Sequence, residues 1–191
     1  MHAFKHFVTI TRHRHKVMAH CFRCGIPFQG LVHDLSKYSP TEFFPSARFY
    51  VGTRSPNEIE RQTYGFSKAW LHHKGRNRHH FEYWYDVDPV TKNYHAVRMP
   101  VRYAAEMFCD RVAASKIYRG KDYTDSDALN YLLNGHHKKY FNPETLELLE
   151  GWLRLLAEQG EKVAFAAVRK AVKEDRKARR KTNKEKSDVA V

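Results

Sequence analysis

The chain of 191 residues is the size of one domain, and its 42% of hydrophobic residues is enough to bury one core. No apolar run approaches the roughly 18 residues that a membrane span needs, and the N-terminal segment carries His, Lys and Arg where a secretory signal would be apolar. We therefore expect a soluble, cytoplasmic protein without a membrane partner, whose three cysteines are thiols rather than disulfides.

Apolar residues recur at spacings of three and four along most of the chain, which predicts helices. In chain order these cover 3–24, 27 to about 39, 40 to about 50, 57–73, 100 to about 118, 125–134, 143–158 and a last helix from about 161. Residues 81–99 instead alternate around a run of turn formers, which predicts a β-hairpin at about 82–98. The predicted fold class is mainly α, a helical bundle with one short hairpin.

Positive charge is concentrated at the C-terminus. The net charge is +13, and residues 169–186 hold ten basic residues against three acidic ones. We expect a single helical domain at 1–172 and a basic, partly disordered tail at 173–191. Such a tail neutralises phosphates without reading sequence, so non-specific nucleic acid is one candidate partner. A solvated extension that only aids solubility is the alternative.

The thirteen histidines are the most unusual feature of the composition, and they occur in clusters. Together with two aspartates they form an ordered set of metal-ligand types: His13, His33–Asp34, His72–His73, His79–His80 and Asp110. Imidazoles and carboxylates are the ligands of divalent ions. A single buried histidine is more often a hydrogen-bonded core residue. The grouping, however, favours one pocket that holds one or two ions.

Adjacent His33 and Asp34 reach one ion only at a helix end or kink, and the break at Ser39–Pro40 supplies such a place. Glu106 precedes Asp110 by one helical turn, so it can orient a histidine. Lys37 follows His33 by one turn and can bind an anion at the metals. A solvated surface lysine is the alternative for Lys37.

Cysteines 21 and 24 are spaced as in half of a zinc knuckle, but the chain has no second half. Both fall on the apolar side of the first helix. We therefore interpret them as core residues.

The order H…HD…D on helices resembles the HD-domain superfamily of metal-dependent phosphohydrolases, and HDLSK at 33–37 is similar to the HD-x-x-K pattern of its two-metal members. More narrowly, GLVHDLSKYSPTEF, HHKGRNRHHFEYW and MPVRYAAEMFCDRVAAS resemble an uncharacterised bacterial and phage family assigned to that superfamily. The resemblance implies an HD-like bundle in which His33 and Asp34 are direct ligands. It also implies that Asp110 closes the site and that His13 is the N-terminal ligand.

The remaining histidines of the HHKGRNRHH motif then complete a second metal position, to which we assign His73, His79 and His80. The first helix offers His13, His15 and His20 for one role. His13 and His20 share a face, so we place His13 at the metal and hold His20 in reserve.

The expected function is hydrolysis of a nucleotide or related phosphate ester by a metal-activated water, with Lys37, Asp34 and Glu106 in catalytic roles. Manganese, iron, cobalt, magnesium and zinc all suit this ligand set. Two alternatives stay open. One is a nucleic-acid-binding accessory protein with a structural metal site, and the other is a di-iron oxygenase of the HD type.

Overall fold

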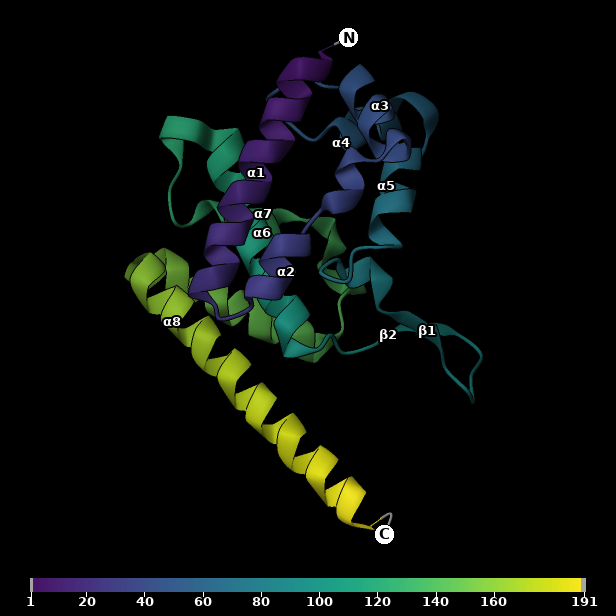
Figure 1. Cartoon of the computed structure of the whole chain (residues 1–191). Helices are drawn as coiled ribbons and strands as arrows, with labels where there is room; N and C mark the ends of the chain where they lie inside the picture. Colours follow the sequence, from purple (N-terminus) through teal and green to yellow (C-terminus); the bar gives the residue numbers. More distant parts are fainter. Residues whose placement is uncertain (1, 190–191) are drawn as a thin grey trace.

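The computed structural model describes residues 2–189, of which 184 and 186–189 are described by backbone alone. Over this range the chain forms eight α-helices and one two-stranded sheet, so the predicted mainly α fold class is confirmed (Figure 1). The helices are α1 Ala3–Arg23, α2 Pro27–Val32, α3 Pro40–Arg48, α4 Pro56–Tyr64, α5 Lys68–Lys74, α6 Val101–Arg119, α7 Asp127–Asn134 and α8 Pro143–Val189. No helix among these residues combines the length and the apolar character needed to cross a membrane.

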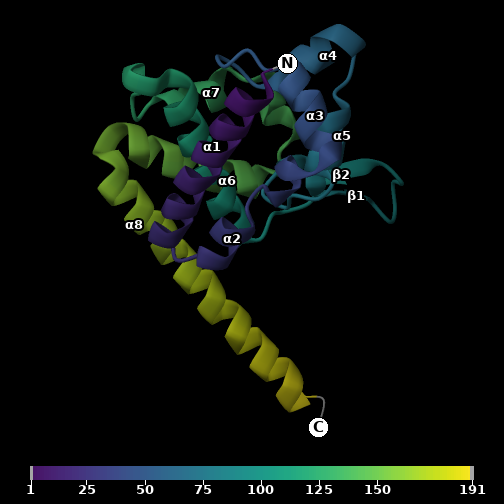
Figure 2. The same ribbon diagram turned by 45° about the horizontal axis from the view of Figure 1, so that its top comes forward.

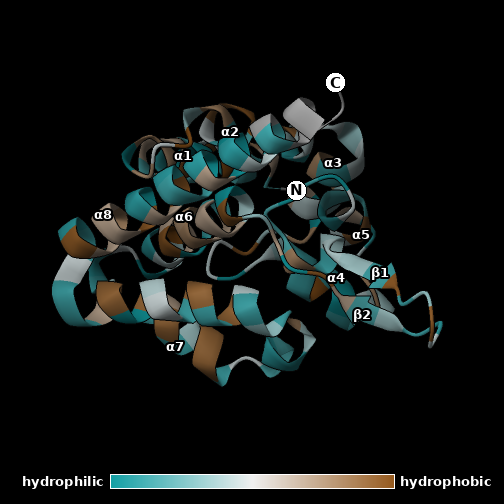
Figure 3. Ribbon diagram, turned by 90° about the horizontal axis from the view of Figure 1, so that it is seen from below, coloured by the Kyte–Doolittle hydropathy of each residue, from teal (hydrophilic) through white to brown (hydrophobic). Residues whose placement is uncertain are grey.

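Helices α1 and α6 pack against each other at the centre, and α8 covers α6 (Figures 1 and 2). Val17 of α1, Phe108 of α6 and Leu153 of α8 are fully buried in the shared core. The sulfur atoms of Cys24 and Cys109 lie 3.5 Å apart in the same core, and all three cysteines are free. The expectation of core thiols is therefore confirmed. Figure 3 shows apolar and polar residues alternating along the helices, as this one-sided burial requires.

Helices α3, α4 and α5 form a second layer beside the N-terminal half of α1 (Figures 1 and 2). The single helix predicted at 57–73 is wrong, because the chain breaks it into α4 and α5. Gly65 has a left-handed backbone (φ 80°) and ends α4. The Ser67 hydroxyl then accepts a hydrogen bond of 3.0 Å from the Trp70 amide and caps α5. This break gives α5 its own direction, which brings His73 toward the interior.

The predicted hairpin is present, as β1 Tyr85–Val87 paired antiparallel with β2 Tyr94–Ala96. It projects from the side of the body in Figures 1 and 2. Trp84, just before β1, packs on Tyr103 of α6 with ring centroids 5.7 Å apart. The hairpin therefore extends the segment that joins α5 to α6 without forming a layer of its own.

Helix α8 bends at Gly160 (φ 77°), where the predicted 143–158 helix ends and the last helix begins. Beyond Val172 no side chain that the structure describes is buried, and the helix leaves the body as a rod (Figures 1 and 2). Residues 173–189 are thus helical, in place of the partly disordered tail that we expected. Intrahelical ion pairs such as Arg179–Asp175 (2.9 Å) stabilise the rod.

Candidate metal centre

The His33–Asp34 pair lies where α2 ends. His33 leaves the helical conformation (φ −52°, ψ 127°), and Asp34 adopts a left-handed one (φ 55°, ψ 23°) before a short 3₁₀ turn at Leu35–Tyr38. Aspartate is among the few non-glycine residues that tolerate this backbone. The two residues are only 1% and 2% exposed. The break therefore occurs at the pair itself, before Ser39–Pro40, and it turns both side chains inward.

The carboxylate of Asp34 faces histidines on both sides. Its Oδ2 atom lies 3.2 Å from Nε2 of His33 and 3.8 Å from Nε2 of His13. Its Oδ1 atom lies 3.3 Å from Nε2 of His73 and 3.5 Å from Nε2 of His79. One carboxylate oxygen thus faces each set of histidines, so Asp34 could serve as a ligand on both sides.

Three groups of ligand atoms are compact enough to hold an ion, because the atoms of each group lie within 4.8 Å of one another. The smallest, His33, His79 and Glu106, is the carboxylate contact described below, and the other two are called the first and second ligand groups. The first group consists of His13, His33, Asp34 and Asp110. The second group consists of Asp34, His73, His79 and His80. All seven predicted metal ligands therefore meet in one cluster, and Asp34 belongs to both groups.

Seven atoms of this cluster are buried and have no hydrogen-bond partner within the described range. They are Nε2 of His13, His33, His73, His79 and His80, and both carboxylate oxygens of Asp34. Some lie within ion-pair distance of one another, but none has hydrogen-bond geometry. Leaving a buried polar atom unpaired costs about 1–3 kcal/mol. Divalent cations, one in each ligand group, could accept these lone pairs, so the donor set fits one or two such ions.

The opposite ring nitrogens are held by carboxylates. Nδ1 of His33 donates to Oε1 of Glu106 at 2.9 Å, and Nδ1 of His79 lies 3.1 Å from the same oxygen. Nδ1 of His73 donates to Glu42 at 2.8 Å. In a neutral ring, a proton on Nδ1 leaves the Nε2 lone pair free for a metal, and the hydrogen bond fixes the ring orientation. Glu106 is thus placed as an orienting partner of histidines, as its spacing predicted.

Glu42 is the residue that sequence reasoning missed. It is 3% exposed, and its second oxygen accepts a hydrogen bond of 2.6 Å from Nδ1 of His72. His72 itself lies outside both ligand groups. In the sequence Glu42 occupies the first turn of a helix, where an acid is favourable for local reasons. Because this local explanation is sufficient, the sequence did not indicate that Glu42 contacts α5.

Both aspartates of the cluster are held in the ionised form. Burial would raise the pKa of Asp34, but the charges of His33 and Lys37 outweigh it and keep this pKa well below its usual value. Burial also opposes ionisation of Asp110, and its interactions with His13 and His33 keep its pKa well below the usual value. Two ionised carboxylates are therefore present to offset the charge of bound cations.

Lys37 lies between the cluster and an adjoining pocket. Its Nζ atom is 2.6 Å from Oδ2 of Asp34, and its side chain lines the pocket. Burial would lower the pKa of Lys37, but Asp34 and Asp110 together raise it, so the side chain is cationic at neutral pH. This position is compatible with the predicted contact to an anion at the metals.

The three histidines that compete for one role in α1 lie in different surroundings. His13 joins the first ligand group, whereas His15 is exposed. His20 is buried, with Nδ1 3.2 Å from the carbonyl oxygen of Cys109 and its ring edge-on to Phe165. His20 is therefore a hydrogen-bonded core residue.

The buried His20 predicts a loss of stability in acid. Burial, reinforced by Lys116 and other nearby cations, lowers the pKa of His20 to about 4 from 6.5. The unfolded chain then binds the proton more readily than the folded chain. The contribution of His20 to the free energy of unfolding is therefore complete above pH 6.5 and is lost as the pH falls toward 4. The loss amounts to about 3 kcal/mol at most. In metal-free protein, His20→Leu should weaken the pH dependence of the unfolding free energy between pH 7 and 4.5. The exposed-site control His15→Leu should retain it, and an unchanged profile in His20→Leu would contradict the assignment.

Comparison with known proteins identifies the family of this chain but does not indicate a function. Searches of curated proteins and of solved structures each found no match. A family model covers residues 2–155, from the start of α1 into the first part of α8, and thus includes every residue of the metal cluster. The chain belongs to DUF5662, a family of unknown function.

Proposed function

We propose that the protein is a metal-dependent phosphohydrolase of the HD type, which cleaves a nucleotide or related phosphate ester at a centre of one or two divalent ions. The observation that carries the proposal is the set of seven buried, unpartnered ligand atoms around Asp34. The likeness of the H…HD…D order to the HD superfamily supports the same conclusion. Divalent ions bound there would polarise a phosphoryl oxygen and lower the pKa of a water molecule.

The residues of the chain have separate tasks in this proposal. Asp34 and the histidines fix the position of the ions, while Glu42 and Glu106 hold three of the imidazole rings. The Lys37 ammonium neutralises charge on the phosphoryl oxygens. In the reaction, the oxygen of water bonds to phosphorus, the ester P–O bond breaks, and the alcohol leaves with a proton.

The test is elemental analysis of protein purified without chelator, followed by a screen of nucleotides and phosphomonoesters with manganese, magnesium, cobalt or iron. We expect phosphate release that requires metal and stops on addition of a chelator. If metal-replete protein releases phosphate from none of these esters, the proposal is wrong.

An oxygenase is the second candidate, because five of the seven ligands are imidazoles, which suit iron as well as other divalent ions. If the protein binds iron, consumes oxygen and hydrolyses no ester, the oxygenase takes the place of the hydrolase as the proposed function.

The rod of α8 supports a separate role in binding nucleic acid. Lys170, Lys173, Lys177 and Arg180 are exposed, and their spacing of three and four residues places them on one helix face. Two acidic residues of the segment are already paired with other cations, Asp175 with Arg179 and Glu185 with Lys181. An apolar stripe for insertion into lipid is missing from the described part of the rod, which favours nucleic acid over a membrane surface.

Removing the residues after Val172 tests this role. We expect the full chain to bind duplex DNA at low salt, with a log–log salt slope of roughly −3 to −4 for four phosphate contacts. The shortened chain keeps Lys170 but loses the other three cations, so it should lose most of this binding. It should keep its metal content, because none of the described side chains beyond Val172 is buried. Equal affinity of the two chains for DNA at low salt would remove the case for a nucleic-acid contact.

A further inference from the structure

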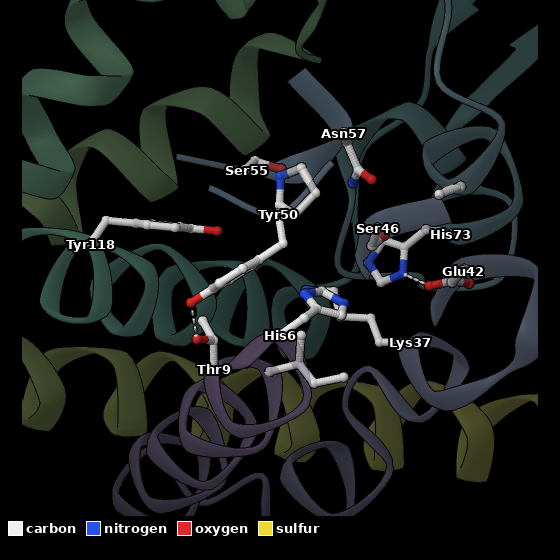
Figure 4. Close-up of a pocket in the computed structure, with 13 residues that line it drawn as sticks. His6, Thr9, Lys37, Glu42, Ser46, Tyr50, Ser55, Asn57, His73 and Tyr118 are labelled. Atoms are coloured by element: carbon white, nitrogen blue, oxygen red, sulfur yellow. Dashed lines mark hydrogen bonds and ion pairs between the residues drawn. The ribbon is translucent and has the colours of Figure 1, made fainter. Parts of the chain in front are cut away.

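A pocket adjoins the metal centre on the side of α3 and α4. Its empty space, open solvent included, is about 490 Å³. Figure 4 shows its polar lining. Six of its thirteen lining residues carry a hydroxyl or amide group: Thr9, Ser46, Tyr50, Ser55, Asn57 and Tyr118. The second ligand group and this pocket share His73, so the pocket lies directly beside the metal centre.

His6 of α1 lies in the middle of this pocket and has an unpaired buried atom. In Figure 4 it lies between the Thr9–Tyr50 hydrogen bond and the pair Lys37 and His73. The residue is 4% exposed, and its Nδ1 has no hydrogen-bond partner among the described residues. His6 belongs to neither ligand group, so a metal does not explain this atom.

His6 offers a ligand in this pocket a neutral ring. Burial, with a smaller effect of the Lys37 charge, lowers the pKa of His6 to about 4. At neutral pH the imidazole therefore has one N–H donor and one lone pair. Its ring already packs against Phe43 and, edge-on, against Tyr50, with centroids 5.4 and 5.5 Å away. These contacts hold the ring in place for a hydrogen bond and occupy the aromatic surface that a stacked base would need.

Charge in the pocket is confined to the end next to the metals. Lys37 pairs with Asp34, and Glu42 bonds to His73. The other polar groups that line the pocket are hydroxyls, one amide and the neutral His6. The end away from the metals thus has hydrogen-bonding capacity without charge, which suits an uncharged, hydroxylated group better than a chain of further phosphates.

We propose that this pocket binds the alcohol part of the phosphate ester. This alcohol is small, uncharged and rich in hydroxyl groups, as in a sugar phosphate. His6 determines this specificity by hydrogen-bonding to one of the hydroxyl groups. The inference rests on the proposed phosphohydrolase function. It narrows the substrate class, since nucleotides and simple phosphomonoesters satisfy the metal centre equally well.

The test compares ribose 5-phosphate, AMP and phenyl phosphate as substrates of the metal-loaded full chain. We expect the lowest KM for ribose 5-phosphate. His6→Leu removes the hydrogen bond and should raise that KM roughly threefold to tenfold relative to the KM for phenyl phosphate, which has no hydroxyl to lose. His6→Asn keeps hydrogen-bonding atoms and should restore part of the difference. The control His15→Leu, on an exposed position of the same helix, should leave the KM ratio as in the wild type.

Failure of this inference is distinct from failure of the function. Hydrolysis without preference for ribose 5-phosphate, or an unchanged KM ratio in His6→Leu, overturns the inference and leaves the hydrolase in place. If no ester is hydrolysed, the proposed function fails. Calorimetric titration of metal-loaded protein then tests whether the pocket binds a hydroxylated ligand. Tighter binding of ribose 5-phosphate than of inorganic phosphate, lost in His6→Leu, supports the pocket; equal binding of the two overturns it.

Discussion

Replacing Asp34 by asparagine should abolish stoichiometric metal binding. Asp34 belongs to both ligand groups, and its two oxygens face different histidines. Asparagine has nearly the same size and also tolerates the left-handed backbone at this position, so the fold should be retained. The substitution removes the negative charge and replaces one of the two ligand oxygens by an amide nitrogen. Loss of an orienting partner alone typically weakens metal binding about 10–100-fold, and loss of this shared ligand should weaken it further.

Asp110→Asn provides the matched comparison. Asp110 belongs to the first ligand group and not to the second, so this variant should keep about half of the metal that the wild type holds when both positions are filled. Asp127→Asn, at an aspartate that pairs with Arg119 away from the cluster, should bind metal as the wild type does. Elemental analysis after buffer exchange measures all three, and circular dichroism checks the fold. Wild-type metal content in Asp34→Asn would disprove the shared-ligand assignment.

The helices were predictable from spacing, whereas the break inside the second layer was not. Apolar periodicity depends on side chains, and it continues through residues 57–73 with little interruption. The break instead depends on backbone features, namely the left-handed Gly65 and the hydroxyl of Ser67 as a cap. A glycine inside a helical pattern is tolerated in many helices, so its effect is decided by tertiary packing. Here α5 packs mainly against α3.

The ligand set was predictable as a set of residues, but the structure was needed to choose among neighbours. His13 and His20 are seven residues apart on one face of α1, and both are buried. Their roles differ because α6 presents different partners to them. Asp110 lies 2.9 Å from Nε2 of His13, while the carbonyl of Cys109 lies next to His20. Periodicity within one helix cannot provide that information.

The pocket is the part of the site that the sequence did not predict. Its end next to the metals is lined by Lys37, Glu42 and His73, but its other polar lining residues, apart from His6, are ordinary serines, tyrosines, a threonine and an asparagine. These come from α1, α3, α6 and the segments before and at the start of α4. None has a recognisable spacing, because they meet only through tertiary packing. His6 had no distinguishing signal either, since the first helix is rich in histidine. Residues with metal-ligand chemistry can be recognised one by one, whereas residues that shape a substrate pocket cannot.

Replacing Lys37 by alanine should lower turnover about 10- to 100-fold while the metal content stays the same. A charge-assisted hydrogen bond contributes about 1.5–3 kcal/mol, and each 1.36 kcal/mol corresponds to a tenfold change in rate. Metal retention follows from the sign of the charge. The Lys37 ammonium lies 2.6 Å from a carboxylate oxygen of Asp34, where it repels a bound cation. Removing it therefore does not weaken metal binding.

Turnover and metal content measured on the same preparation separate the two roles that Lys37 can have. If Lys37 contacts the phosphoryl group, Lys37→Ala loses turnover at full metal content, and Lys37→Arg, which keeps a cation at this position, recovers part of it. If Lys37 only pairs with Asp34, turnover stays at the wild-type level whenever metal is present. Lys68→Ala removes an exposed lysine of α5 and serves as the control for net charge. Undiminished turnover of metal-replete Lys37→Ala would exclude a contact between this ammonium and the reacting phosphate.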